Sequence, residues 1–113
     1  MKPEGRRLRA LAMTSAARSP AAPEIPTVAE SGVPGYSAGL WYGLLAPAKT
    51  PKEIVQRLSL EIGRILKLPD VREKFLSQGI DPRGSTPEEF ARLIATDLEK
   101  WAKVIKAAGV RVD

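Results

Sequence analysis

Apolar residues recur at helical spacing through the second half of the chain, which predicts three amphipathic helices. Two long segments, one after Thr50 and one after Thr86, carry apolar side chains three or four positions apart. A shorter segment, Asp70 to Gln78, lies between Pro69 and Gly79, residues that end helices. The apolar positions of the two long segments are Ile54, Val55, Leu58, Ile62, Ile65 and Leu66, and Phe90, Leu93, Ile94, Leu98, Trp101, Val104, Ile105 and Ala108.

The two long helices begin with nearly the same signal. Thr50-Pro51-Lys52-Glu53 and Thr86-Pro87-Glu88-Glu89 each place Thr at the N-cap, Pro at the first helical position and Glu two residues later. The Thr oxygen can accept from an exposed amide, the Glu can reach back to the cap, and Pro has no amide to leave unpaired. Gly109 is expected to end the last helix.

The first half of the chain predicts two short strands joined by a stiff connector. Leu8 to Thr14 is a short apolar run typical of a buried strand, and Leu40 to Ala46 is a second candidate that contains Trp41 and Tyr42. Ser15 to Pro26 holds three prolines, which favour an extended chain. Thr27 to Ser31 is expected to form a short capped helix that Gly32 ends.

This order of elements predicts an α/β fold that is only partly present. Two strands are too few for a sheet that is stable alone, and three amphipathic helices need a surface to cover. We therefore expect the helices to pack on a sheet that other residues supply, with Trp101 in the core.

Composition excludes several kinds of chemistry. The 113 residues include no cysteine and no histidine, which rules out disulfides, Cys/His zinc sites and histidine-based catalysis. The acidic residues are scattered over helix surfaces without a nucleophile or base, so we expect neither an enzyme nor a bound cofactor. No apolar run approaches the roughly 20 residues of a membrane-spanning helix.

The net charge of +5 is concentrated at the N-terminus. The first twenty residues contain five basic residues and one acidic residue, Glu4; the basic ones are Lys2, Arg6, Arg7, Arg9 and Arg18. A basic arm of this kind can bind nucleic acid, but no nucleic-acid-binding motif accompanies it. The favoured interpretation is a set of surface arginines beside a strand, and no nucleic-acid partner is expected.

An ordered series of motifs resembles the C-terminal part of a known family. The matching pieces are Leu8 to Ser15, Arg18-Ser19-Pro20, Pro23 to Gly32, Trp41 to Pro51, Pro69 to Phe75, Thr86 to Phe90, Glu99 to Trp101 and Val104 to Gly109. Together they resemble the Bug-type extracytoplasmic solute-binding proteins, the receptors of tripartite tricarboxylate transporters. No single piece is diagnostic, but their order is specific and covers nearly the whole chain.

The resemblance implies a partial type II periplasmic-binding-protein fold, with two α/β lobes that close on a ligand. Residues 1–15 would then finish the second lobe, residues 16–40 would form the proline-rich hinge, and residues 41–113 would complete the first lobe. Receptors of this family are far longer than 113 residues. We therefore expect a C-terminal fragment that lacks most of the binding cleft.

Five residues are candidates for ligand binding. Ligands in open α/β sheets sit beyond the carboxyl ends of strands, where Thr14 and Ser15 are expected. Their hydroxyls or amides could donate to a carboxylate, unless they form only a strand-to-turn transition. One ring of Trp41 and Tyr42 could cover the ligand, Trp41 being favoured, because strand alternation puts the two on opposite faces. Arg18 could pair with an anion, although a surface role in the hinge is the stronger interpretation.

The leading hypothesis is therefore part of a periplasmic receptor that captures small carboxylates, di- or tricarboxylates or acidic amino acids, for the membrane components of a tripartite tricarboxylate transporter. Alone, the chain is expected to bind ligand weakly or not at all. It shows no signal peptide, so it is expected to stay in the cytoplasm if made as it stands. The alternatives are a small helical interaction module that self-associates through uncovered apolar faces, and a nucleic-acid binder acting through the basic arm.

Overall fold

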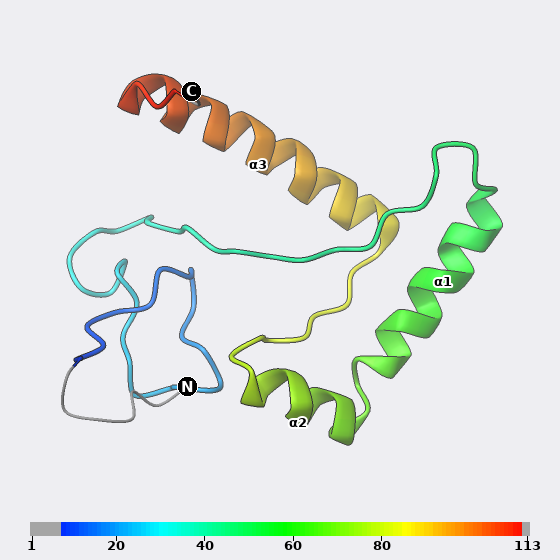
Figure 1. The fold of residues 1–113 in the computed structure, drawn as a ribbon, viewed down its shortest axis with the longest axis horizontal. Helices are drawn as coiled ribbons and strands as arrows, with labels where there is room; N and C mark the ends of the chain where they lie inside the picture. Colours follow the sequence, from blue (N-terminus) through cyan, green and yellow to red (C-terminus); the bar gives the residue numbers. More distant parts are fainter. Residues whose placement is uncertain (1–7, 112–113) are drawn as a thin grey trace.

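The computed structural model describes residues 8–111, and its second half is helical (Figure 1). Three helices follow in order: α1 (Lys52–Ile65), α2 (Pro69–Ser77) and α3 (Pro87–Ala108). The three helices predicted from the apolar pattern are therefore confirmed, with α2 beginning and ending one residue earlier than predicted. The expected basic arm lies mostly at Lys2, Arg6 and Arg7, outside the described residues.

Helix α3 begins and ends as its sequence predicts. The Thr86 hydroxyl accepts from the Glu89 amide, and the Glu89 carboxylate accepts from the Thr86 amide, each over 3.1 Å. Pro87 occupies the first helical position, and Gly109 caps the other end in the left-handed conformation with φ 65°. This reciprocal bonding satisfies amides that the first turn would otherwise leave unpaired.

Helix α1 lacks the cap that its sequence predicts. Its N-cap is Pro51, which makes no side-chain capping bond, and the helix begins at Lys52. The Thr50 amide instead donates to the Pro47 carbonyl over 3.0 Å, which closes a turn before the helix. Thr50 therefore lies one residue too early to cap, and the prediction of a capping box there is wrong.

The two predicted strands do not form among residues 8–111. Leu8 to Thr14 and Leu40 to Ala46 contain no strand, and the nearest approach to a sheet is one isolated parallel bridge between Met13 and Thr27. A strand exists only where a neighbour pairs with its amides and carbonyls, and such neighbours are missing here. The sequence pattern of these segments suits a sheet, but the described chain cannot build one alone.

The short helix predicted at Thr27 to Ser31 is a turn instead. The Ser31 amide donates to the carbonyls of Thr27 and Val28, both over 3.1 Å, and the Val33 amide donates to the Val28 carbonyl over 3.4 Å. Gly32 then takes φ 115°, a conformation that only glycine adopts without strain. The turn ends near Gly32, and no helix develops here.

The elements are spread in an open arrangement (Figure 1). An extended segment, residues 36–47, runs beside α3 in the opposite direction and leads to α1. Helix α1 contacts α3, and the Ser59 hydroxyl of α1 donates to the Ser85 carbonyl just before α3 over 3.1 Å. Residues 8–35 fold back on themselves at the other end of the molecule.

Very little of the described chain is buried. Among residues 8–111 only Ala22, Thr27 and Pro82 are buried, and no helix contains a buried residue. Trp101, expected in the core, is 37% exposed on the apolar face of α3. Within the described residues, the extended segment covers only part of the apolar face of α3, and no residue of α1 is buried.

The accessible surface area shows how open the structure is. The accessible surface is 9942 Å² for a chain of 12.2 kDa, whereas a compact monomer of this mass exposes about 6,000 Å². The radius of gyration is 17.3 Å, against about 13 Å for a compact domain of this length. Helix faces that are amphipathic but uncovered account for this open shape.

The unequal caps of α1 and α3 give a matched pair of variants. We expect Thr86→Ala to destabilise α3 by about 1 kcal/mol, because it removes a capping bond, and Thr50→Ala to have little effect. Urea or thermal unfolding followed by circular dichroism at 222 nm measures both. Equal losses from the two variants would contradict the assigned cap positions.

Candidate functional site

The predicted ligand residues Thr14 and Ser15 lie where two passes of the chain meet. The Met13 amide donates to the Pro26 carbonyl over 2.8 Å, and the Met13 carbonyl accepts from the Val28 amide over 2.9 Å. The Thr14 carbonyl accepts from the Ala38 amide over 2.8 Å. Backbone bonds therefore fix this junction from two sides.

The side chains at the junction are accessible to different degrees. Thr14 is exposed, and Ser15 is half-buried, with its hydroxyl donating to the Ala17 carbonyl over 2.7 Å. The Thr14 hydroxyl is thus on the surface of a backbone that is held in place. Such a group can donate one hydrogen bond to a carboxylate oxygen.

Arg18 is engaged within the connector. Its Nε donates to both carboxylate oxygens of Glu30, at 3.2 and 3.0 Å, and its Nη1 donates to the Pro23 carbonyl over 3.1 Å. The Glu30 carboxylate also accepts from the Thr27 amide over 2.8 Å, and the Thr27 hydroxyl accepts from the Glu30 amide over 3.1 Å. We call Arg18, Glu30 and Thr27 the connector clamp.

The clamp includes the most buried residue of the described chain. Thr27 is 1% exposed, and its neighbours Pro26 and Val28 bond to Met13. The hydrogen bond from Arg18, followed by that from the Thr27 amide, lowers the pKa of Glu30 from 4.5 to about 2. The Glu30 carboxylate in turn raises the pKa of Arg18. The pair is therefore fully charged throughout the neutral range.

Trp41 and Tyr42 take different environments, although no strand forms at this segment. The Trp41 indole N–H donates to the Asp97 carboxylate over 2.6 Å, and its ring meets Phe90 edge-on at 5.3 Å and 83°. Trp41 is 39% exposed and Tyr42 is 78% exposed. The Trp41 ring thus fastens the extended segment to α3, while the Tyr42 ring faces outward.

Two further contacts strengthen this attachment to α3. Lys100 donates from its ammonium to the Ser37 carbonyl, and the same ammonium lies 5.3 Å from the centre of the Trp101 ring. At Gly43, an added Cβ would clash with the ring of Phe90, so the absence of a side chain lets that ring lie this close. Residues 37–43 therefore follow α3 closely.

Sequence reasoning missed several of these residues. Asp97, Lys100 and Ser37 stand more than fifty positions from their partners, and no local pattern signals such contacts. The capping signal Thr27 to Glu30 was visible, but the pairing of Glu30 with Arg18 was not. That pairing depends on how the proline-rich connector folds back.

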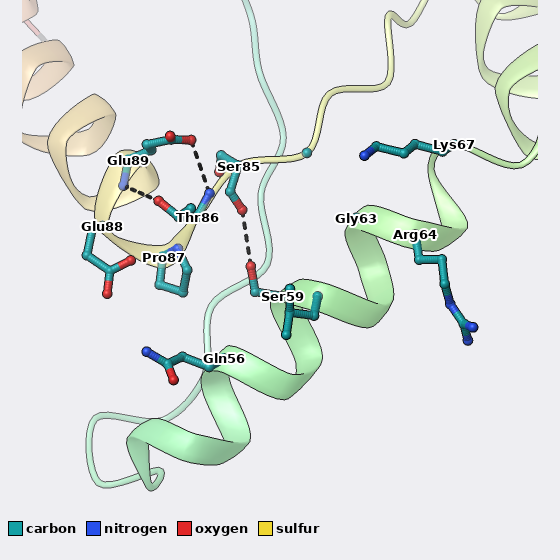
Figure 2. Close-up of a pocket in the computed structure, with 12 residues that line it drawn as sticks. Gln56, Ser59, Gly63, Arg64, Lys67, Ser85, Thr86, Pro87, Glu88 and Glu89 are labelled. Atoms are coloured by element: carbon teal, nitrogen blue, oxygen red, sulfur yellow. Dashed lines mark hydrogen bonds between the residues drawn. The ribbon is translucent and has the colours of Figure 1, made fainter.

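A hollow of ≈ 630 Å³ between α1 and the start of α3 offers no convergent site (Figure 2). Glu88 and Glu89 lie on one side of it, and Arg64 points away and donates to Glu61 over 2.7 Å. The Thr86 and Glu89 side chains already bond to the helix backbone. The hollow is an opening between α1 and the start of α3, and the side chains of Ser59, Arg64, Thr86 and Glu89 bond to groups of the chain itself.

Residues 8–111 contain neither a metal site nor a membrane-spanning helix. No group of acidic side chains there could hold a metal ion. None of the helices in that range is long and apolar enough to span a bilayer.

The low pKa of Glu30 predicts how the clamp responds to acid. Because that pKa is depressed in the folded chain, the stability that the pair contributes is fully present above about pH 4.5. It is lost as the pH falls toward 2. We expect the Glu30 carboxyl carbon to titrate near pH 2 by NMR, and nearer its ordinary value in Arg18→Met. Titration near 4.5 with Arg18 intact would contradict the clamp.

The family model of the tripartite tricarboxylate transporter family receptor, TctC, matches residues 3–110 of this chain. A Pseudomonas sp. (strain P51) protein, the UPF0065 protein in the tcbD-tcbE intergenic region, is 43% identical over 101 residues. That match covers 88% of this chain and 30% of the relative. Protein BugT of Bordetella pertussis (strain Tohama I) is 36% identical over 105 residues, covering 93% of this chain and 32% of BugT.

Solved structures agree with the sequence matches. R. palustris Rpa4515 with adipate superposes with a TM-score of 0.73 at 37% identity, over 88% of this chain and 33% of that one. The periplasmic binding protein BugD gives a TM-score of 0.70 at 33% identity, over 88% and 34%. The chain thus spans about a third of the length of each of these relatives. It belongs to the tripartite tricarboxylate transporter receptor family, whose members are periplasmic binding receptors and not enzymes.

Proposed function

We propose that this chain contributes the C-terminal part of a periplasmic receptor that captures a small carboxylate for a tripartite tricarboxylate transporter. The observation that carries the proposal is the match to R. palustris Rpa4515 with adipate, at 37% identity and a TM-score of 0.73. A linear dicarboxylate such as adipate is therefore the first ligand to test. The membrane components of the transporter are the proposed partners.

The proposed division of the chain follows the two-lobed family fold. Residues 1–15 would finish the second lobe, residues 16–40 would cross the hinge, and residues 41–113 would complete the first lobe. The compact bonding around Met13 and Thr27, and the separate group of helices after residue 50, support a boundary within the connector. The apolar faces of α1 and α3 would then pack on segments that correspond to the rest of the relatives' length.

Thr14, Ser15, Trp41, Tyr42 and Arg18 stay in the proposed ligand site. The exposed Thr14 hydroxyl and the exposed Tyr42 ring are the best placed to meet a ligand. Ser15 follows Thr14 on the same fixed backbone. Arg18 and Trp41 already donate to Glu30 and Asp97, so they support the edges of the site.

A second candidate function rests on the uncovered apolar faces. Large exposed apolar surface usually signals association, so a helical module that binds another copy of itself is the competing proposal. The exposed large side chains include Ile54, Leu58 and Ile65 of α1 and Leu98, Val104 and Ile105 of α3.

A chimera distinguishes the two. In it, this chain replaces the matching third of R. palustris Rpa4515, and adipate binding is measured by calorimetry. We expect the chimera to bind adipate and the chain alone to bind weakly or not at all. Thr14→Ala should weaken binding roughly ten-fold or more, because one hydroxyl bond to a charged group is worth about 1.5–3 kcal/mol.

Thr50→Ala is the matched control, since it removes a hydroxyl that makes no capping bond, and it should leave the affinity unchanged. A folded chimera that does not bind any di- or tricarboxylate or acidic amino acid would contradict the receptor proposal. Sedimentation that shows a well-packed dimer of the chain alone would favour the interaction module.

A further inference from the structure

The connector clamp links one exposed ion pair to the backbone that carries Thr14. Arg18 lies four residues after Thr14, and Glu30 lies three residues after Thr27. The Glu30 carboxylate joins them by accepting from Arg18 Nε at 3.0 Å and from the Thr27 amide at 2.8 Å. One carboxylate therefore holds both arms of the loop that begins at Thr14.

Backbone contacts connect the clamp to the junction at Thr14. Thr27 is buried and forms the parallel bridge with Met13, the residue before Thr14. The Thr14 carbonyl is held from its other side by the Ala38 amide at 2.8 Å. Hydrogen bonds therefore connect the clamp to Thr14 without a gap.

Direct ligand contact fits Arg18 less well than support does. Its Nε is shared between the two Glu30 oxygens, and its Nη1 donates to the Pro23 carbonyl. Turning the guanidinium toward a ligand would leave the Glu30 carboxylate without its charged partner. Charge-assisted bonds of this kind are about twice as strong as neutral ones.

We propose that Arg18 and Glu30 are positioning residues, which fix Thr14 and Ser15 for ligand without touching the ligand themselves. This inference rests on the proposed carboxylate-receptor function. It assigns the pair a role that acts through the backbone of Met13 and Thr27.

The test uses the same chimera with adipate and compares Glu30→Gln, Arg18→Met and Glu24→Gln. Glu24 is an exposed carboxylate in the same connector, which makes it the matched control. Glu30→Gln and Arg18→Met are expected to weaken adipate binding by similar amounts, about three- to ten-fold, and Glu24→Gln is expected to have no effect. If Arg18 contacted the ligand, Arg18→Met would weaken binding while Glu30→Gln left it unchanged or stronger, which would overturn the inference.

A double-mutant cycle between Thr14→Ala and Glu30→Gln separates positioning from general stability. Because the clamp acts through Thr14, the two losses of affinity should be clearly less than additive, measured well below the unfolding temperature. The Ala38 amide, which bonds to Thr14, should also exchange faster with solvent in Glu30→Gln. Additive losses, or a lower melting temperature with unchanged affinity, would overturn the inference. A wild-type chimera without any adipate binding would instead remove the proposed function on which it rests.

Discussion

Uncovered apolar surface is the constraint on which the rest of this structure depends. Burial of apolar side chains is the main favourable term in folding, worth about 25 cal/mol per Å². Helices α1 and α3 have the apolar faces to obtain it, yet neither contains a buried residue. The surface of 9942 Å², against about 6,000 Å² for a compact monomer, shows how far this chain is from the packing of a compact domain. The chain also spans only about a third of the length of these two relatives.

Polar contacts supply much of the order that the described chain does have. The connector is held by the Arg18–Glu30 pair and the buried Thr27, and the extended segment is held to α3 through Trp41 and Lys100. Such contacts are specific in geometry but modest in net free energy, because folding exchanges them for bonds to water. They fix local shape around Thr14 and along α3, whereas they cannot replace a core. The backbone around Thr14 is thus held by hydrogen bonds although little of the described chain is buried.

The sequence predicted those features that depend on neighbouring residues. The three helices, the Thr86 capping box and the Gly109 stop all follow from spacing within a few positions, and all are present. The strands were not obtained because pairing depends on segments far away or outside this chain. At Thr50 the same four-residue signal failed, since a turn with Pro47 displaced the helix start. The partners of Arg18 and Trp41 depend on tertiary folding, so sequence reasoning named the residues but not their contacts.

Amide hydrogen exchange tests the central claim most directly. The measurement compares α1 and α3 in this chain alone and in the chimera that restores the rest of a receptor. If the apolar faces need those other segments, amides of both helices should exchange at least about 100-fold more slowly in the chimera, because covered helices open only by larger unfolding. Equal protection in the two samples would show that this chain covers its own helices, and it would contradict the account.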